Sequence, residues 1–170
     1  QHPSTHGVLQ VQLELDGERI VKATPIMGYL HRGIEKLLEA RTYAQGLPYT
    51  DRLDYISAMN NNFGYARAVE ELAGIETTPR AEYIRVIMAE LNRINSHLIF
   101  IGTLANDLGA STGMLYCFRD RERILDIFNL VCGARQTFHY IRIGGVKEDL
   151  SPEAAEMIRA FVDSVPDFLA

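Results

Sequence analysis

The chain has 170 residues, of which 47% are hydrophobic and 23% are charged, and its formal net charge is −5. This size and composition are ordinary for one globular domain with a sizeable core. The acidic balance argues against a phosphate-binding surface and gives no sign of a nucleic-acid partner. No apolar run reaches the roughly 18 residues that a membrane-spanning helix needs, so no such helix is predicted.

Cysteine and histidine give no pattern of metal ligands. The two cysteines, Cys117 and Cys132, lie outside any CxxC or Cys/His cluster. We interpret them as buried thiols in helices, because free cysteine packs as a small apolar residue. His2 and His6 stand four residues apart, but no further ligand lies beside them at a fixed spacing. The sequence therefore predicts no metal site in this chain.

Residues 1–25 are predicted to form a β-hairpin element that begins with a loop. Alternate residues after the loop are apolar and share one face of a strand: Leu9, Val11, Leu13 and Leu15. Asp16 and Gly17 supply the turn, and ERIVKA returns as the second strand. A two-stranded hairpin is marginal alone, so we expect it to pack on something else.

Residues 26–170 change to helical periodicity and are predicted to form a bundle of long helices. A short helix is expected near residues 28–43, before Pro48 breaks the chain. A second helix is expected from residue 50 or 51 to Ala73, with Gly74 as its stop. The fold class is thus α+β and mainly α, with a small N-terminal antiparallel element before the bundle.

The longest helix is predicted to begin at Thr78 and Pro79, as cap and first residue, and to run about 28 residues, roughly 42 Å. One apolar stripe marks its buried face: Ile84, Ile87, Met88, Leu91, Ile94, Leu98, Ile101 and Ala105. A third long helix is expected over residues 118–140. Its apolar face continues into Arg135, an unusual place for a charge. A last helix is expected to start at Ser151 and Pro152.

Several polar residues occupy positions that cost free energy in a helix. Asp107 lies at the C-terminal end of the long helix, where the helix dipole favours cations. Asn60, Asn61 and Asn62 follow one another inside a predicted helix, although asparagine side chains compete for the backbone there. His97 is interpreted as a core or interface histidine. These residues leave two classes open: an enzyme subunit with a proton-handling site, or a structural subunit of an assembly.

The order of the motifs narrows this choice. QHPSTHGV, GYLHRGIEKLLEARTYAQGLPYTDRLDYIS, GTLANDLGA, FRDRERILD and YIRIGGVKEDL follow one another along the chain. Together they resemble the D-type subunit family of respiratory complex I, NADH:quinone oxidoreductase, over essentially all 170 residues. The family is related to the large subunits of nickel–iron hydrogenases and its members are about twice as long. The resemblance therefore implies a fragment that matches their N-terminal half.

The hydrogenase reading fails at two positions. The hydrogenase stretch equivalent to RLDYIS carries two cysteines that hold the metal, and this chain has Asp54 and Ser57 there. Nickel prefers soft thiolate ligands, which Asp and Ser do not replace. The resemblance thus implies a hydrogenase-like fold that has lost its metal site.

The resemblance also implies a quinone site with three catalytic residues. Tyr55 and His6 match a tyrosine and a histidine between which the quinone headgroup is thought to bind, and Asp107 matches the carboxylate partner of the histidine. Tyrosine and histidine can each donate a hydrogen bond to a quinone oxygen. A neighbouring Asp favours the imidazolium and keeps a proton ready.

Electrons are expected from an iron–sulfur cluster held by a neighbouring subunit, because this chain lacks the cysteines to hold one. Arg32 matches a family arginine close to that cluster, and Thr103 matches a residue lining the quinone cavity. A family histidine near the cluster is replaced by Thr137, and His139 stands two residues further on. The expected partners are therefore quinone and other complex I subunits, especially the iron–sulfur subunit.

The implied location is peripheral, on the cytoplasmic side of the cell inner membrane or the matrix or stromal side of an organelle membrane. The alternative function is a non-catalytic scaffold subunit of a related membrane-bound hydrogenase-like complex, or of a dehydrogenase complex that uses another electron donor. The presence of Tyr55, His6 and Asp107 together favours the catalytic reading, since a scaffold need not keep all three.

Overall fold

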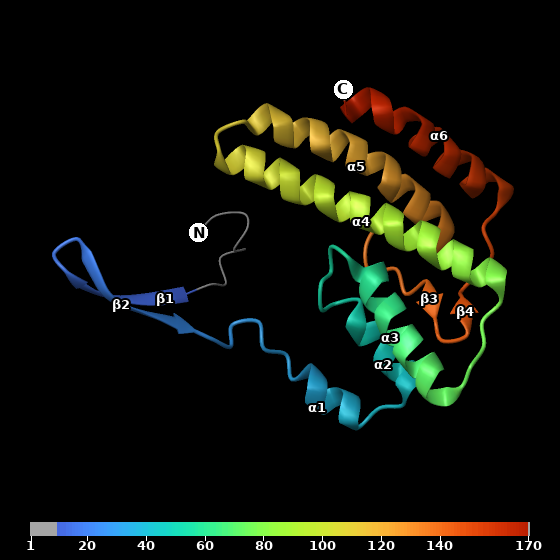
Figure 1. The fold of residues 1–170 in the computed structure, drawn as a ribbon, viewed down its shortest axis with the longest axis horizontal. Coiled ribbons are helices and arrows are strands. Elements are labelled where there is room, and N and C mark those ends of the chain that lie inside the picture. Colours follow the sequence, from blue (N-terminus) through green and yellow to red (C-terminus); the bar gives the residue numbers. More distant parts are fainter. Residues whose placement is uncertain (1–9, 170) are drawn as a thin grey trace.

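The computed structural model describes residues 10–169 as a body of helices from which a β-hairpin projects (Figure 1). This arrangement confirms the predicted fold class, which is mainly α with a small N-terminal antiparallel element. The elements, in chain order, are β1 (Gln10–Asp16), β2 (Arg19–Ile26), α1 (Ile34–Glu39), α2 (Tyr43–Thr50), α3 (Ala58–Ala73), α4 (Pro79–Asp107), α5 (Ser111–Cys132), β3 (Ile141–Arg142), β4 (Gly145–Val146) and α6 (Pro152–Leu169).

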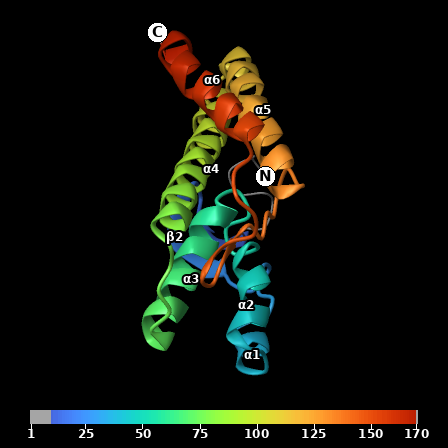
Figure 2. The same cartoon turned by 90° about the vertical axis from the view of Figure 1, so that its right-hand side faces the viewer.

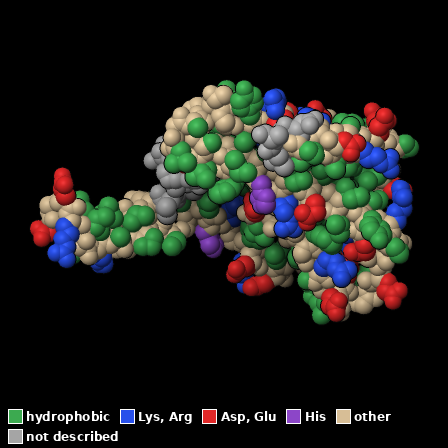
Figure 3. Space-filling model, turned by 45° about the horizontal axis from the view of Figure 1, so that its top comes forward, with side chains coloured by type: hydrophobic (Ala, Val, Ile, Leu, Met, Phe, Trp, Pro, Cys, Tyr) green, Lys and Arg blue, Asp and Glu red, His purple; other side chains and the backbone are tan. Residues whose placement is uncertain are grey.

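The predicted hairpin is confirmed. β1 and β2 pair antiparallel from Gln10 opposite Ile26 to Asp16 opposite Arg19, and Gly17 takes the positive φ of 62° that the turn needs. Every residue of both strands is exposed. Hydrophobic side chains are visible along the projecting arm (Figure 3). Within the described residues the arm therefore leaves its apolar face open, and the expected packing of that face does not occur there.

The helical body has two parts. α4 and α5 pack along each other and α6 packs on α5, while α3 lies under α4 and contacts α2 (Figures 1 and 2). The small β3–β4 hairpin lies beside α3 and α4. Buried apolar side chains join these layers into one core: Leu47, Ala58, Met59, Ala66, Ile84, Met88, Leu91, Leu98, Ile124, Leu125, Ile127, Phe128, Cys132, Phe138, Tyr140, Ile141 and Phe161.

The predicted extents of the first two helices are wrong. Pro48 does not break the chain but lies inside α2, which begins with a capping box between Thr42 and Gln45. Residues 51–57 form turns, so α3 begins at Ala58 instead of residue 50 or 51, and α1 is shorter than expected. The predicted stop of α3 is confirmed, because Gly74 caps it in the left-handed conformation.

The third long helix also lies earlier in the chain than predicted. α5 spans Ser111–Cys132 instead of residues 118–140, and Gly133 ends it with a φ of 74°. Arg135 therefore lies beyond the helix, and its guanidinium folds back to pair with Glu122 and Asp126 of α5. The charge that looked misplaced on an apolar face belongs to a loop that returns along the helix.

The buried face of α4 differs in part from the predicted stripe. Its start is confirmed, because the Thr78 hydroxyl accepts the Ala81 N–H. Ile84, Met88, Leu91 and Leu98 are buried, but Ile87, Ile101 and His97 are exposed. The buried face of α4 also includes three polar side chains, namely Arg85, Asn92 and Asn95. His97 is therefore not a core histidine, and its alternative place at an interface stays a prediction.

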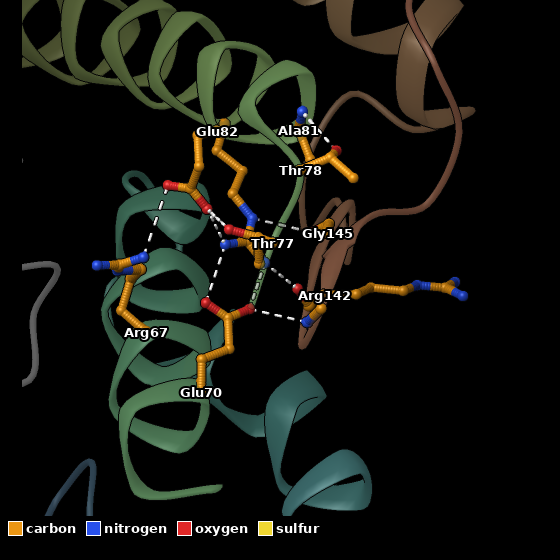
Figure 4. Close-up of polar contacts among 10 residues, drawn as sticks. Arg67, Glu70, Thr77, Thr78, Ala81, Glu82, Arg142 and Gly145 are labelled. Carbon is orange, nitrogen blue, oxygen red and sulfur yellow. Dashed lines mark hydrogen bonds and ion pairs between the residues drawn. The ribbon is translucent and has the colours of Figure 1, made fainter. Parts of the chain in front are cut away.

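Arg85 is the largest fully buried side chain and joins four elements. Its guanidinium pairs with Glu70 of α3 and with Glu82 of α4 at 2.7 Å. It also donates to the main-chain oxygens of Arg142 in β3, at 2.6 Å, and Gly145 in β4, at 3.0 Å. Figure 4 shows these acceptors converging from the two helices and the small hairpin. The hairpin is thus fixed to the helices by one cation.

Glu70 is the matching buried anion of this cluster. Its carboxylate accepts hydrogen bonds from Arg85 and, at 2.8 Å, from the Gly144 N–H. Burial raises the pKa of the Glu70 carboxyl, but the hydrogen bonds from Arg85 and Gly144 outweigh burial and hold this pKa below its usual value. Both charges are therefore compensated although water does not reach them.

We expect Arg85→Met to lower the free energy of unfolding by about 3–5 kcal/mol, because it leaves the buried Glu70 carboxylate without its cation. Urea denaturation followed by circular dichroism would measure the loss. Arg80→Met is the control, since it breaks the exposed pair of Arg80 with Asp149 and should have a small effect. Equal losses in the two variants would contradict the role given to Arg85.

Candidate functional site

Tyr55 lies in the turns between α2 and α3, and its side chain is 40% exposed. The buried side chain of Asn92 in α4 holds this segment by two hydrogen bonds. Asn92 accepts the Met59 N–H at 2.9 Å and donates to the Ile56 carbonyl at 3.0 Å. The Gln136 side chain, in the segment after α5, donates to the Tyr55 main-chain oxygen at 3.3 Å. The position of Tyr55 is therefore set by long-range contacts.

The three consecutive asparagines have structural partners outside their own turn of helix. Asn60 donates to the Ser57 hydroxyl and to the Ala89 carbonyl of α4. Asn61 donates to the Asp54 carbonyl, and the fully buried Asn62 donates to the Thr50 hydroxyl at 2.8 Å. The asparagines thus tie the start of α3 to α2, to α4 and to the Tyr55 turn.

Thr103 and Asp107 lie one turn apart at the C-terminal end of α4, on the same face of the helix. The Thr103 hydroxyl lies 2.8 Å from the Ile99 carbonyl of its own helix, so its hydrogen is occupied while its lone pairs can accept a hydrogen bond. Asp107 is exposed, and it forms no ion pair within residues 10–166.

The Tyr55 turn and Asp107 are positioned by different parts of α4. Asn92 contacts the Tyr55 turn, and Asp107 lies about 15 residues further along α4, a rise of roughly 22 Å. The structure therefore places Asp107 about four turns along α4 from the residue that holds the Tyr55 turn. His6, the predicted third residue, lies outside the described residues, as do His2 and Leu9.

Arg32 lies just before α1 and reaches the Tyr55 turn. Its guanidinium donates to the Arg52 carbonyl at 3.4 Å, and the Arg52 guanidinium donates to the Pro48 carbonyl at 2.6 Å. Two cations therefore border the turn that carries Tyr55. Of the residues predicted for the site, the structure thus brings Arg32 to the Tyr55 turn, and it places Thr103 with Asp107 at a separate end of α4.

The segment after α5 contributes residues that sequence reasoning did not assign to the site. Thr137 and His139 both have positive φ values, of 58° and 44°, which are uncommon for residues other than glycine. His139 is half-buried, and its Nδ1 has no hydrogen-bond partner among the described residues. Burial lowers the pKa of His139, and the cations of Arg142 and Arg52 lower it further. The imidazole is therefore neutral near pH 7.

Two absences apply to the described part of the chain. Among these residues, no three His, Cys, Asp or Glu side chains lie together as a possible metal site. Across residues 10–169, no helix combines the length and the apolar character required to cross a membrane.

Asn92→Ala is expected to lower the free energy of unfolding by about 2 kcal/mol or more, because the Met59 N–H and the Ile56 carbonyl lose a buried partner. It should also raise amide hydrogen exchange at residues 55–59, measured by mass spectrometry. Asn129→Ala, at an exposed position of α5, serves as the control and should leave exchange in this segment unchanged. Unchanged exchange in Asn92→Ala would contradict the proposed support of the turn.

Comparison with known proteins gives consistent relatives along nearly the whole chain. The D-type subunit of NADH-quinone oxidoreductase from Desulforamulus reducens is 57% identical over 167 residues, which are 98% of this chain and 46% of that protein. Its counterpart from Clostridium beijerinckii is 56% identical over 165 residues, 97% of this chain and 45% of that protein. The chain thus spans less than half the length of these curated relatives. The family model described as "Respiratory-chain NADH dehydrogenase, 49 Kd subunit" matches residues 107–170. The chain therefore belongs to the family of 49 kDa, or D-type, subunits of respiratory-chain NADH dehydrogenase.

Proposed function

We propose that the chain forms part of the quinone-reduction site of an NADH:quinone oxidoreductase. The observation that carries this proposal is the half-exposed Tyr55 on a turn fixed by Asn92 of α4, the helix that ends in Asp107. A turn held by buried hydrogen bonds can present a phenol in a constant position. We assign the quinone ring and the His6 side chain to the region between the Tyr55 turn and the Asp107 end of α4.

Reduction of a quinone to a quinol takes up two electrons and two protons. The Tyr55 phenol and the His6 imidazole would each donate a hydrogen bond to one quinone oxygen, stabilising the negative charge that develops there. With reference pKa values near 10 and 6.5, tyrosine and histidine can each release a proton to the reduced oxygen. Asp107 would pair with the protonated His6 and favour its charged form before transfer.

The electrons would come from an iron–sulfur cluster of a neighbouring subunit. The two cysteines of this sequence cannot supply the four thiolates that such clusters usually need. Arg32 borders the Tyr55 turn and carries a permanent charge, so we assign it to the side facing the cluster. The exposed hairpin β1–β2 would pack on neighbouring parts of the enzyme. The chain would then be peripheral, on the cytoplasmic side of the membrane or its organelle equivalent.

Tyr55→Phe in the intact enzyme is expected to reduce the rate of quinone reduction by about tenfold or more, because the phenyl ring cannot donate a proton. Electron supply is measured separately by reduction of an artificial acceptor, which should stay unchanged. Tyr83→Phe alters a tyrosine of α4 that is 73% exposed, and it serves as the matched control. Normal quinone turnover in Tyr55→Phe would refute this role and favour the scaffold alternative.

Arg32→Gln is expected to lower the midpoint potential of the neighbouring iron–sulfur cluster, because removing a nearby positive charge makes the reduced cluster less stable. A redox titration followed by electron paramagnetic resonance would measure the potential. Arg41→Gln, on the exposed segment after α1, removes a charge of the same kind and should leave the potential unchanged. A potential unchanged in Arg32→Gln would place this arginine away from the cluster.

A further inference from the structure

Asp51 is a buried carboxyl group that the proposed reaction does not use. It follows α2 directly and opens the turns that carry Tyr55, and its side chain is fully buried. Neither of its carboxylate oxygens has a hydrogen-bond partner among the described residues. The Asn62 amide and the His139 main-chain N–H lie near enough to lower the pKa of this carboxyl, but neither forms a well-shaped hydrogen bond with it, so an ionised carboxylate here would be poorly compensated for its lost hydration.

The nearest cation compensates this carboxyl only weakly. Arg52 Nη1 lies 3.5 Å from Asp51 Oδ2, but the same nitrogen donates to the Pro48 carbonyl at 2.6 Å. The Arg52 side chain is also 43% exposed, so water screens its charge. The ion pair is therefore not the full, bidentate pairing that Arg85 gives to Glu70 in the same molecule.

The other groups that face Asp51 come from three further elements. From α3, Asn62 has a buried Oδ1 without a donor, and its amide already donates to Thr50. From the end of α5 comes Cys132, whose thiol pKa is raised by burial to about 12. The charge of Lys147, which follows β4, lowers this pKa and the charge of Asp51 raises it, and the thiol is neutral. From the segment before β3 comes His139, whose Nδ1 also has no partner among the described residues.

We propose that Asp51 is a proton-holding site, a neutral carboxylic acid at pH 7, and that with His139 it forms a proton reserve behind the Tyr55 turn. A protonated carboxyl gains one O–H donor. Asn62 Oδ1 is a buried acceptor without a donor that this hydrogen can serve, and His139 Nδ1 is a second one when the imidazole carries its hydrogen on Nε2. One proton therefore relieves an excess of acceptors that the described residues do not satisfy.

The electrostatics of the pocket agree with this protonation state. Burial raises the pKa of the Asp51 carboxyl above its usual value, and this effect exceeds the opposing effects of Asn62, Arg52 and the main-chain N–H of His139. His139 itself is kept neutral by burial and by the cations of Arg142 and Arg52.

Asp51 and the segment that carries His139 both adjoin the Tyr55 turn. Gln136, three residues before His139, donates to the Tyr55 carbonyl, and Asp51 begins the same turn. The role of the reserve in the reaction rests on the proposed function. When Tyr55 has given its proton to the reduced quinone, the reserve returns one proton to the Tyr55 phenolate. Asp51 is then left as a carboxylate beside Arg52 and the His139 N–H, and no electrons move in this step. Asp51 acts here as a positioning residue, because it works through Tyr55.

Infrared difference spectroscopy of the assembled enzyme at pH 7, without quinone, tests the proton directly. We expect the wild-type enzyme to show a protonated carboxyl band that is missing in Asp51→Asn and present in Asp149→Asn. Asp149 is an exposed carboxylate paired with Arg80, and it is the matched control. Absence of a band that depends on Asp51 would overturn the proposal. Asparagine is close in shape to the neutral acid, so the variant is expected to fold.

A pH series of unfolding gives a second measurement. Because the folded pKa of Asp51 lies above the unfolded value of 3.8, the folded state binds more protons above that pH. Stability at Asp51 is therefore full below pH 3.8 and declines as the pH rises through the folded pKa. Asp51→Asn should remove this decline, and Asp149→Asn should keep it. A decline that persists in Asp51→Asn would overturn the assignment of the proton.

The pH profile of quinone reduction tests the link to Tyr55. In Asp51→Asn the alkaline limb should move to lower pH by about one unit, because the reserve no longer supplies the proton, while Asp149→Asn should match the wild type. An alkaline limb that does not move in Asp51→Asn would refute the link. Failure of the proposed function would appear instead as normal turnover in Tyr55→Phe, and the infrared band would still decide the state of Asp51.

Discussion

The arrangement of the helical body depends on the buried guanidinium of Arg85. A buried cation is tolerated only when its donors are satisfied, and Arg85 meets this condition with acceptors from α3, α4, β3 and β4. It joins Glu70 to the small β3–β4 hairpin, far away in the sequence. The segment between α5 and this hairpin is thereby fixed, and it is the segment that contacts Tyr55 and lies near Asp51.

The buried polar groups divide into two kinds with different consequences. The Arg85–Glu70 pair and Asn92 have their partners, so they rigidify the junction of α3, α4 and the Tyr55 turn. Asp51, Asn62 Oδ1 and His139 Nδ1 lack hydrogen-bond partners among the described residues, although they lie in the same part of the fold. A well-satisfied frame thus surrounds a small region with too many acceptors. This contrast is the basis of the proposed proton at Asp51.

Several apolar surfaces of the described residues are exposed and would gain from further packing. Both strands of the β1–β2 hairpin are exposed, and large apolar side chains of α4 such as Tyr83, Phe100 and Ile101 face outward. Since two-stranded hairpins are marginal in water by themselves, the hairpin is expected to gain stability from further packing. The relatives are more than twice as long as this chain, so such packing can come from the same protein or from other subunits.

Local sequence by itself determined the elements whose signals are local. Gly17 ends a strand and Gly74 ends a helix because glycine adopts positive φ values at little cost. Thr78 and Pro79 begin α4 as its cap and its first residue. The family motifs also named Tyr55, Asp107, Thr103, Arg32 and His6, and the assignment of these residues to a site stays a prediction. Tertiary structure alone decided why Arg85 and Asn92 are buried, and that the carboxylate oxygens of Asp51 have no well-formed hydrogen bond among the described residues. These features rest on contacts between residues far apart in the chain, and a linear pattern does not encode which side chain meets which partner.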